Sequence, residues 1–153
     1  MTSAFPPSRA MALALAEAKA AAARGEVPVG AVILSPDGVV LAQAGNRTLG
    51  DLDPTAHAEV VAIRAACERL GSERLAGCDL YVTLEPCPMC ATAISFARVR
   101  RLYYAAPDAK GGGVEHGPRI YAQPTCHHRP DVYSGIAESE SAALLRDFFR
   151  DRR

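Results

Sequence analysis

Short apolar runs alternate with helical patterns along this chain, and this alternation is the strongest constraint on its fold. Strand-length runs cover residues 29–34, 39–44, 80–84 and 100–105, with a weaker strand pattern at 131–134. Helical patterns cover 8–24, 86–97 and 136–150. A further helix is expected to begin at Asp53-Pro54 and end near Leu70, because Asp is a good N-cap and Pro is tolerated in a first turn. This order predicts a layered α/β sandwich around one mixed sheet.

Length and composition fit a single domain. The chain has 153 residues, of which 49% are hydrophobic, enough to bury a core. No apolar run approaches the roughly 20 residues of a membrane span, and the first residues lack the apolar region of a secretory signal. We therefore expect one domain over residues 1–153, no membrane partner and a cytoplasmic location.

The cysteines do not suggest a disulfide framework. There are five, an odd number, at positions 67, 78, 87, 90 and 126. Cys67, Cys78 and Cys126 are expected to be small buried hydrophobic residues. The close pair Cys87 and Cys90 needs another explanation.

Cys87 and Cys90 lie in Pro86-Cys87-Pro88-Met89-Cys90, at the start of a predicted helix. Residues three apart there share one face, so both sulfur atoms can reach one point. A helix N-terminus favours negative charge and therefore thiolates, the form that binds metal.

His57, in His57-Ala58-Glu59, is the candidate third ligand. Two thiolates, a neutral imidazole and one Zn²⁺ per chain form a neutral site with one open tetrahedral position, the mark of a catalytic zinc. A water in that position has its pKa lowered to about 7. No organic cofactor is implied.

Glu59 is better placed for proton transfer than for ligation. Positions two apart on a helix do not face each other, so Glu59 is a poor co-ligand beside His57. Its carboxylate could take a proton from the water and return it to the substrate. A lone C-x-x-C or a lone His is a weak signal, but H-x-E combined with P-C-x-x-C is the pattern of zinc nucleobase deaminases.

With these motifs the chain resembles the cytidine deaminase superfamily and, more closely, the bacterial tRNA adenosine deaminases. The likeness covers about residues 9–152 and includes Glu26-Val-Pro-Val-Gly-Ala31, Gly45-Asn-Arg47, Asp53-Pro-Thr-Ala-His-Ala-Glu59, Leu80-Tyr-Val-Thr-Leu-Glu-Pro-Cys87, Asp108-Ala-Lys110 and Ala143-Leu-Leu-Arg-Asp-Phe-Phe149. It implies a three-layer α-β-α sandwich with a five-stranded mixed sheet, and a homodimer. It also implies hydrolytic deamination of adenosine to inosine at the wobble position of a tRNA anticodon stem-loop.

The resemblance also implies substrate contacts. Asn46 would contact a flipped nucleoside, the Val29-Gly30 backbone would line its pocket, and Asp108 and Lys110 would contact the anticodon-loop backbone. Spacing alone would equally allow Asn46 to be a turn residue. The alternative for Asp108 and Lys110 is a solvated loop.

The segment at 111–128 departs from the family pattern. Residues 111–126 diverge from it, and His127-His128 stands where Asn-His is expected. These histidines are not expected to bind the zinc, because a fourth protein ligand would fill the position that the water needs.

Charge leaves the substrate class open. Net charge is zero, but residues 95–153 carry ten Lys/Arg against seven Asp/Glu, and residues 1–94 carry seven against ten. An RNA would therefore be held by a local patch, for which the candidates are Arg98, Arg100, Arg101, Lys110, Arg150, Arg152 and Arg153. The alternatives are a deaminase of a free base or nucleoside, of guanine or cytosine type, and a non-catalytic zinc-stabilised RNA-binding module. A purely structural zinc site would have no use for Glu59.

Overall fold

Five strands form one mixed sheet in the computed structural model, which describes residues 5–152. Their order across the sheet is β2-β1-β3-β4-β5. Strand β1 is antiparallel to both of its neighbours, the edge strand β2 and β3, whereas β3, β4 and β5 run parallel to one another. The strands span Gly30–Leu34 (β1), Val40–Gly45 (β2), Asp79–Leu84 (β3), Arg101–Ala106 (β4) and Asp131–Ser134 (β5).

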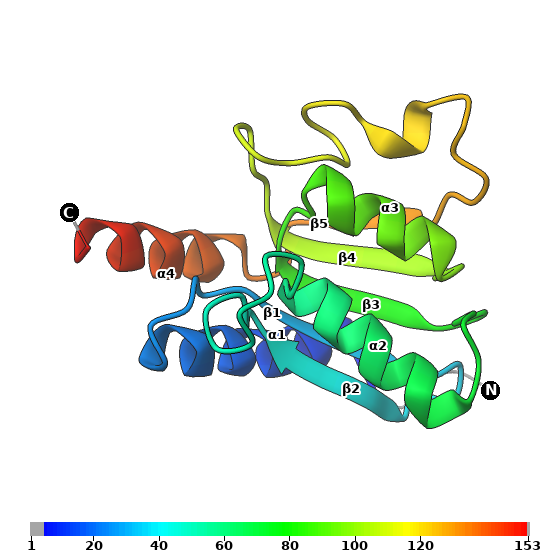
Figure 1. Cartoon of the computed structure of the whole chain (residues 1–153), viewed down its shortest axis with the longest axis horizontal. Coiled ribbons are helices and arrows are strands. Elements are labelled where there is room, and N and C mark those ends of the chain that lie inside the picture. Colours follow the sequence, from blue (N-terminus) through cyan, green and yellow to red (C-terminus); the bar gives the residue numbers. More distant parts are fainter. Residues whose placement is uncertain (1–4, 153) are drawn as a thin grey trace.

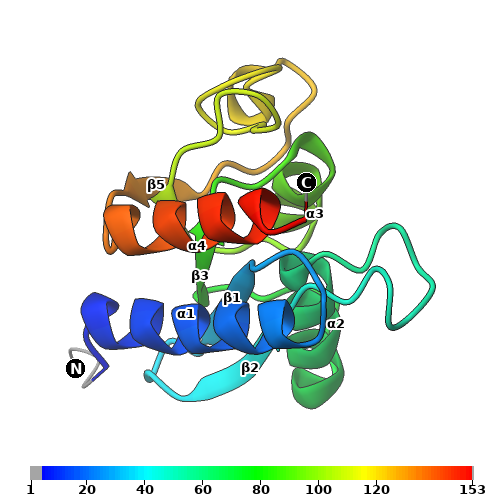
Figure 2. The same ribbon diagram turned by 90° about the vertical axis from the view of Figure 1, so that its left-hand side faces the viewer.

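Helices cover both faces of this sheet (Figures 1 and 2). On one face lie α1 (Pro7–Ala23), against β1, β2 and β3, and α4 (Glu138–Arg150), against β3 and β4. On the other face lie α2 (Ala58–Leu70) and α3 (Pro88–Phe96), which also contact each other. The expected three-layer α-β-α sandwich with a five-stranded mixed sheet is confirmed.

Side chains that alternate along the strands contribute to two apolar cores, one on each face of the sheet. In β1, Ala31 and Ile33 join the apolar cluster beneath α2 and α3, while Val32 and Leu34 join the cluster beneath α1. Successive side chains of a strand point to opposite faces, so a strand buried on both faces reads as an unbroken apolar run. This is why residues 29–34 lack a polar alternation.

Gly30 allows α1 to approach the sheet closely. A Cβ at this position would lie 1.9 Å from the carbonyl oxygen of Ala14. The facing side of α1 is also small, since Ala10, Ala14 and Ala18 are all buried. Glycine is therefore required where β1 begins.

The expected start of the second helix at Asp53 is wrong. Instead of capping a helix, Asp53 Oδ1 accepts hydrogen bonds from the backbone N–H and the hydroxyl of Thr55, at 2.9 and 2.7 Å. This local turn delays α2 until Ala58 and leaves His57 as an extended N-cap residue.

The other expected elements are present within two residues of their expected ends. A short 3-10 helix, η1 (Ile120–Ala122), was not expected. Among the helices of residues 5–152, none has the length and apolar character needed to cross a membrane.

Candidate active site

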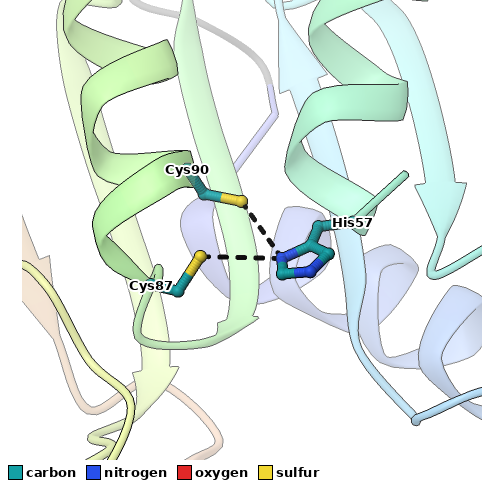
Figure 3. A group of neighbouring side chains, drawn as sticks. All are labelled: His57, Cys87 and Cys90. Atoms are coloured by element: carbon teal, nitrogen blue, oxygen red, sulfur yellow. Dashed lines mark hydrogen bonds between the residues drawn. The ribbon is translucent and has the colours of Figure 1, made fainter. Parts of the chain in front are cut away.

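Two helix starts bring the proposed metal ligands together. His57 is the N-cap residue of α2, Cys87 is that of α3, and Cys90 lies within the first turn of α3. His57 Nδ1 lies 3.6 Å from Cys87 Sγ and 3.5 Å from Cys90 Sγ (Figure 3). Within the described chain, these three residues form the one group of three or more His, Cys, Asp or Glu side chains whose ligand atoms all lie within 4.8 Å of one another.

These distances fit a tetrahedral zinc. Bond lengths of about 2.3 Å to sulfur and about 2.05 Å to nitrogen place the two ligand atoms about 3.6 Å apart at a tetrahedral angle. The observed Nδ1–Sγ separations match this value. His57, Cys87 and Cys90 therefore form a zinc-binding site.

The acidic groups buried at the site also favour binding of a cation. A hydrogen bond from Cys90, followed by one from His57, lowers the pKa of the Cys87 thiol to about 4. Hydrogen bonding to that sulfur, together with burial, raises the pKa of Cys90. Cys90 and Glu59 are both buried beside Cys87. Three acidic groups packed together away from water need a positive partner before all can ionise.

Glu59 lies at the second position of α2, beside the ligands but outside their group. Its side chain is only 4% exposed, and burial raises its pKa to about 7. A carboxyl group with a pKa near neutrality can both accept and return a proton.

The site opens into a cavity of about 300 Å³. Its wall includes His57, Cys87 and Glu59 together with Val29, Asn46 and Asp108. Six of the nine residues expected at the site thus surround one space. Of the others, Cys90 is fully buried, Gly30 packs against α1, and Lys110 is exposed on the loop that follows Asp108.

A buried carboxylate holds the loop that carries Asn46. Glu26 accepts hydrogen bonds from the backbone N–H groups of Leu49, at 3.1 Å, and Gly50, at 2.8 Å. It also accepts one from Asn46 Nδ2, at 3.3 Å. Burial alone would raise the pKa of Glu26, but these backbone hydrogen bonds and the nearby Arg24 guanidinium lower it overall.

A second buried carboxylate holds the opposite loop. Glu85 accepts hydrogen bonds from the backbone N–H groups of Asp108, Val114, Glu115 and His116, at 3.0–3.1 Å. The ring Nδ1 of His116 lies 2.7 Å from Glu85 Oε1. Burial would raise the pKa of Glu85, but these hydrogen bonds lower it overall. The loop wraps this carboxylate tightly, since a Cβ at Gly112 would lie 2.4 Å from Glu85 Oε2.

Sequence reasoning gave neither Glu26 nor Glu85 a role. Both stand in segments that carry the family resemblance, but the backbone N–H groups that bind them are at least 23 residues away. A charged residue next to a Pro-containing turn is normally predicted to be exposed to solvent. The one available signal was the position of Glu85 directly between a buried strand and the cysteine motif.

The remaining candidates lie apart from the site. Arg100 is held by Asp79 through two contacts of 3.1 Å, at the end of β4 opposite to Asp108. His128 Nε2 lies 2.6 Å from the carbonyl oxygen of Val99, outside the ligand group, as expected. Cys78 is buried in the core, and Cys67 and Cys126 pack against it. Arg153 lies outside the described residues.

Comparison with known proteins agrees with this geometry. Residues 6–106 match the cytidine and deoxycytidylate deaminase zinc-binding region. The chain is 66% identical over 143 residues to the tRNA-specific adenosine deaminase of Agrobacterium fabrum, covering 94% of this chain and 93% of the relative.

Solved structures give the same family. A structure from a study of A-to-I editing by tRNA:A34 deaminases superposes with a TM-score of 0.89 at 65% identity, covering 90% of this chain and 99% of that one. The guanine deaminase of Bacillus subtilis is more distant, with a TM-score of 0.67 at 32% identity over 93% of this chain and 94% of that one. The chain therefore belongs to the cytidine and deoxycytidylate deaminase family and, within it, to the tRNA-specific adenosine deaminases.

Proposed function

We propose that this protein converts adenosine to inosine at the wobble position of a tRNA anticodon by hydrolysis. The observation that carries the proposal is that the zinc ligands, Glu59 and Asn46 meet at one cavity, in a chain 66% identical to a tRNA-specific adenosine deaminase. We also propose a cytoplasmic location, because tRNA is the proposed substrate.

In the overall reaction, a water oxygen bonds to C6 of the purine and the 6-amino group leaves as ammonia. When bound, the metal supplies a Lewis acid that makes a water nucleophilic near neutral pH. Glu59 takes one proton from the attacking water and delivers it to the ring nitrogen next to C6. It then transfers the second water proton from the new C6 hydroxyl to the amino group, which leaves as ammonia. Its place in the wall of the cavity, outside the ligand group, supports this role.

The size of the cavity suits an RNA substrate that inserts a single nucleoside into it. About 300 Å³ is at the small end of ligand pockets. A stem-loop cannot enter such a space, so the reacting base must leave its stack. Bases in a single-stranded loop are already partly unstacked, which lowers the cost of that step. Asn46 would contact the inserted nucleoside, and the backbone at Val29 and Gly30 would border it.

The rest of the stem-loop would lie outside the cavity. Asp108 lies at its wall, and the exposed Lys110 is on the same loop, suited to a phosphate or ribose contact. Arg150 and Arg152, at the end of α4, offer further cationic groups. Arg98, Arg100 and Arg101 lie at the start of β4, away from the end that leads to Asp108, and are poorly placed for this RNA.

We also propose that the protein is a homodimer. The helix α3 carries the second zinc motif and leaves Phe96 69% exposed and Met89 37% exposed. Large apolar side chains on a helix that borders the active site suit a subunit interface. Sedimentation analysis is expected to give a dimer, and a stable, active monomer at micromolar concentration would contradict this.

A parallel substrate assay tests the function. The zinc-loaded protein is offered an anticodon stem-loop, free adenosine, cytidine and guanine, with Glu59→Ala as the inactive control. We expect rapid inosine formation in the stem-loop and slow turnover of free adenosine. Efficient turnover of guanine or cytidine without reaction of the stem-loop would establish the free-base alternative, which the likeness to guanine deaminase supports.

A further inference from the structure

Glu26 is a buried carboxylate that the proposed chemistry does not use. Glu26 lies in the segment between α1 and β1 and is only 3% exposed. Oε1 accepts hydrogen bonds from Asn46 Nδ2 and the Leu49 N–H, and Oε2 accepts one from the Gly50 N–H. The carboxylate thus ties three points of one loop to the segment whose Val27 and Val29 line the cavity.

This contact dictates which way the Asn46 amide points. An ionised carboxylate only accepts hydrogen bonds, so the NH₂ group of Asn46 must face Glu26. The second hydrogen of that group is donated to Thr48 Oγ1, at 3.3 Å. Both amide hydrogens are therefore used, and Oδ1 is the polar atom that Asn46 can offer to a ligand.

The main chain at Asn46 is fixed independently. Its N–H donates to the carbonyl oxygen of Val29, at 3.1 Å, and its own carbonyl oxygen accepts from the Arg24 guanidinium, at 3.2 Å. With the backbone fixed on both sides, the remaining freedom is rotation of the side-chain amide. Glu26 and Thr48 remove that freedom.

We propose that Glu26 is a positioning residue, which orients Asn46 so that Oδ1 accepts a hydrogen bond from a donor on the inserted nucleoside. This inference rests on the proposed function, because it assumes a nucleoside in the cavity. The donor is either a ribose hydroxyl or an amino group. Neither group could donate to an Asn46 turned the other way, since its NH₂ would then face the ligand.

A double-mutant cycle between Glu26→Gln and Asn46→Ala tests the coupling. In Glu26→Gln an NH₂ group replaces one acceptor oxygen, so a loop N–H loses its partner and Asn46 can turn over. We expect kcat on the stem-loop to fall about 10- to 100-fold, with KM changed less than about threefold. In the Asn46→Ala background the same substitution should have little further effect. If the two effects simply multiply, Glu26 does not act through Asn46 and the proposal is overturned.

Asp51→Asn is the matched control. It makes the same carboxylate-to-amide change in the same loop, but Asp51 is exposed and forms a surface ion pair with Arg47 at 3.0 Å. We expect near wild-type kcat, because exposed ion pairs contribute little. A loss equal to that of Glu26→Gln would show that any change of charge in the loop suffices, which would overturn the specific role of Glu26.

A stem-loop with 2′-deoxyadenosine at the wobble position separates the two donors. If the ribose 2′-hydroxyl is the donor, this substrate reacts slowly and Glu26→Gln slows it little further. If another hydroxyl or the amino group is the donor, Glu26→Gln slows both substrates equally. Either result supports the proposal, whereas no effect of Glu26→Gln on either substrate overturns it.

Backbone amide exchange gives a readout that does not need activity. In Glu26→Gln the Leu49 and Gly50 amides should exchange faster than in the wild type, and in Asp51→Asn they should not. Unchanged exchange would overturn the inference even if the enzyme deaminates the stem-loop. If the wild type does not deaminate the stem-loop, but Glu26→Gln still speeds exchange of the Leu49 and Gly50 amides, the proposed function is overturned instead. If Glu26→Gln fails to fold, Thr48→Val takes its place, because it removes the other acceptor of the Asn46 amide. Thr48→Val should lower kcat by a smaller factor, and it should lower kcat no further in the Asn46→Ala background.

Discussion

His57 Nδ1 lies 3.5 Å from Cys90 Sγ, although 33 residues separate them in the chain. The two residues come from the starts of two adjacent helices on the same face of the sheet. The metal site thus ties α2 to α3, so that metal binding should be linked to the stability of this layer.

Removal of one zinc ligand should release the metal. Cys90 is a fully buried member of the ligand group. We expect about one zinc per chain in the wild type and none in Cys90→Ala, with the free energy of unfolding lowered by about 4 kcal/mol or more. Elemental analysis and chemical denaturation measure both effects.

Cys78→Ala is the control for this experiment. Cys78 is equally buried, but it lies in the core away from the ligands. It should keep its zinc and lose about 1 kcal/mol of stability. Well-folded wild-type protein without zinc would contradict the assignment of the site.

Glu59→Ala should separate metal binding from catalysis. Because Glu59 lies outside the ligand group, the variant should keep its zinc and its fold. Activity on the stem-loop should fall about 100- to 10,000-fold, the usual contribution of a general acid or base. Zinc content and kcat are measured on the same sample. Loss of zinc comparable to that in Cys90→Ala would make Glu59 a ligand instead.

Glu85→Ala should loosen the loop that carries Asp108 and Lys110. The substitution leaves four backbone N–H groups without their acceptor. We expect the free energy of unfolding to fall by about 3 kcal/mol and the amides at 108–116 to exchange faster. The exposed Glu68, on α2, gives the comparison: Glu68→Ala should change stability by less than about 0.5 kcal/mol. Equal effects of the two substitutions would show that the Glu85 contacts contribute nothing.

Lys110→Ala should weaken RNA binding because it removes the proposed contact with a phosphate of the stem-loop. Binding of the stem-loop by the wild type should weaken as salt rises, and the variant should show a salt slope reduced by about one unit. Turnover of free adenosine should not change. Fluorescence anisotropy across a salt series measures the slope, and an unchanged slope would place Lys110 outside the RNA contact.

The sequence was sufficient for the layers and the metal ligands because both depend on local patterns. The unbroken apolar run of β1 predicts a strand buried on both faces, and two cysteines three apart at a helix start share one face. The start of α2 could not be read in this way. Asp53 can cap either a helix or a turn, and its bond to Thr55 settles the competition five residues before the helix begins.

Glu26 and Glu85 were beyond sequence reasoning for a different reason. Each is stabilised as a buried charge by backbone N–H groups from a distant loop, which carry no side-chain signature. Only the fold shows that the loops at 46–52 and 108–116 meet these carboxylates on two sides of one cavity.

The central claim is that this chain makes inosine at the wobble position of tRNA. Sequencing of cellular tRNA after depletion of the protein tests it most directly, because inosine pairs as guanosine and is read as such during copying. The account predicts that the guanosine signal at the wobble position reverts to adenosine, and that wild-type protein restores it whereas Glu59→Ala does not. Full retention of inosine after depletion would contradict the account.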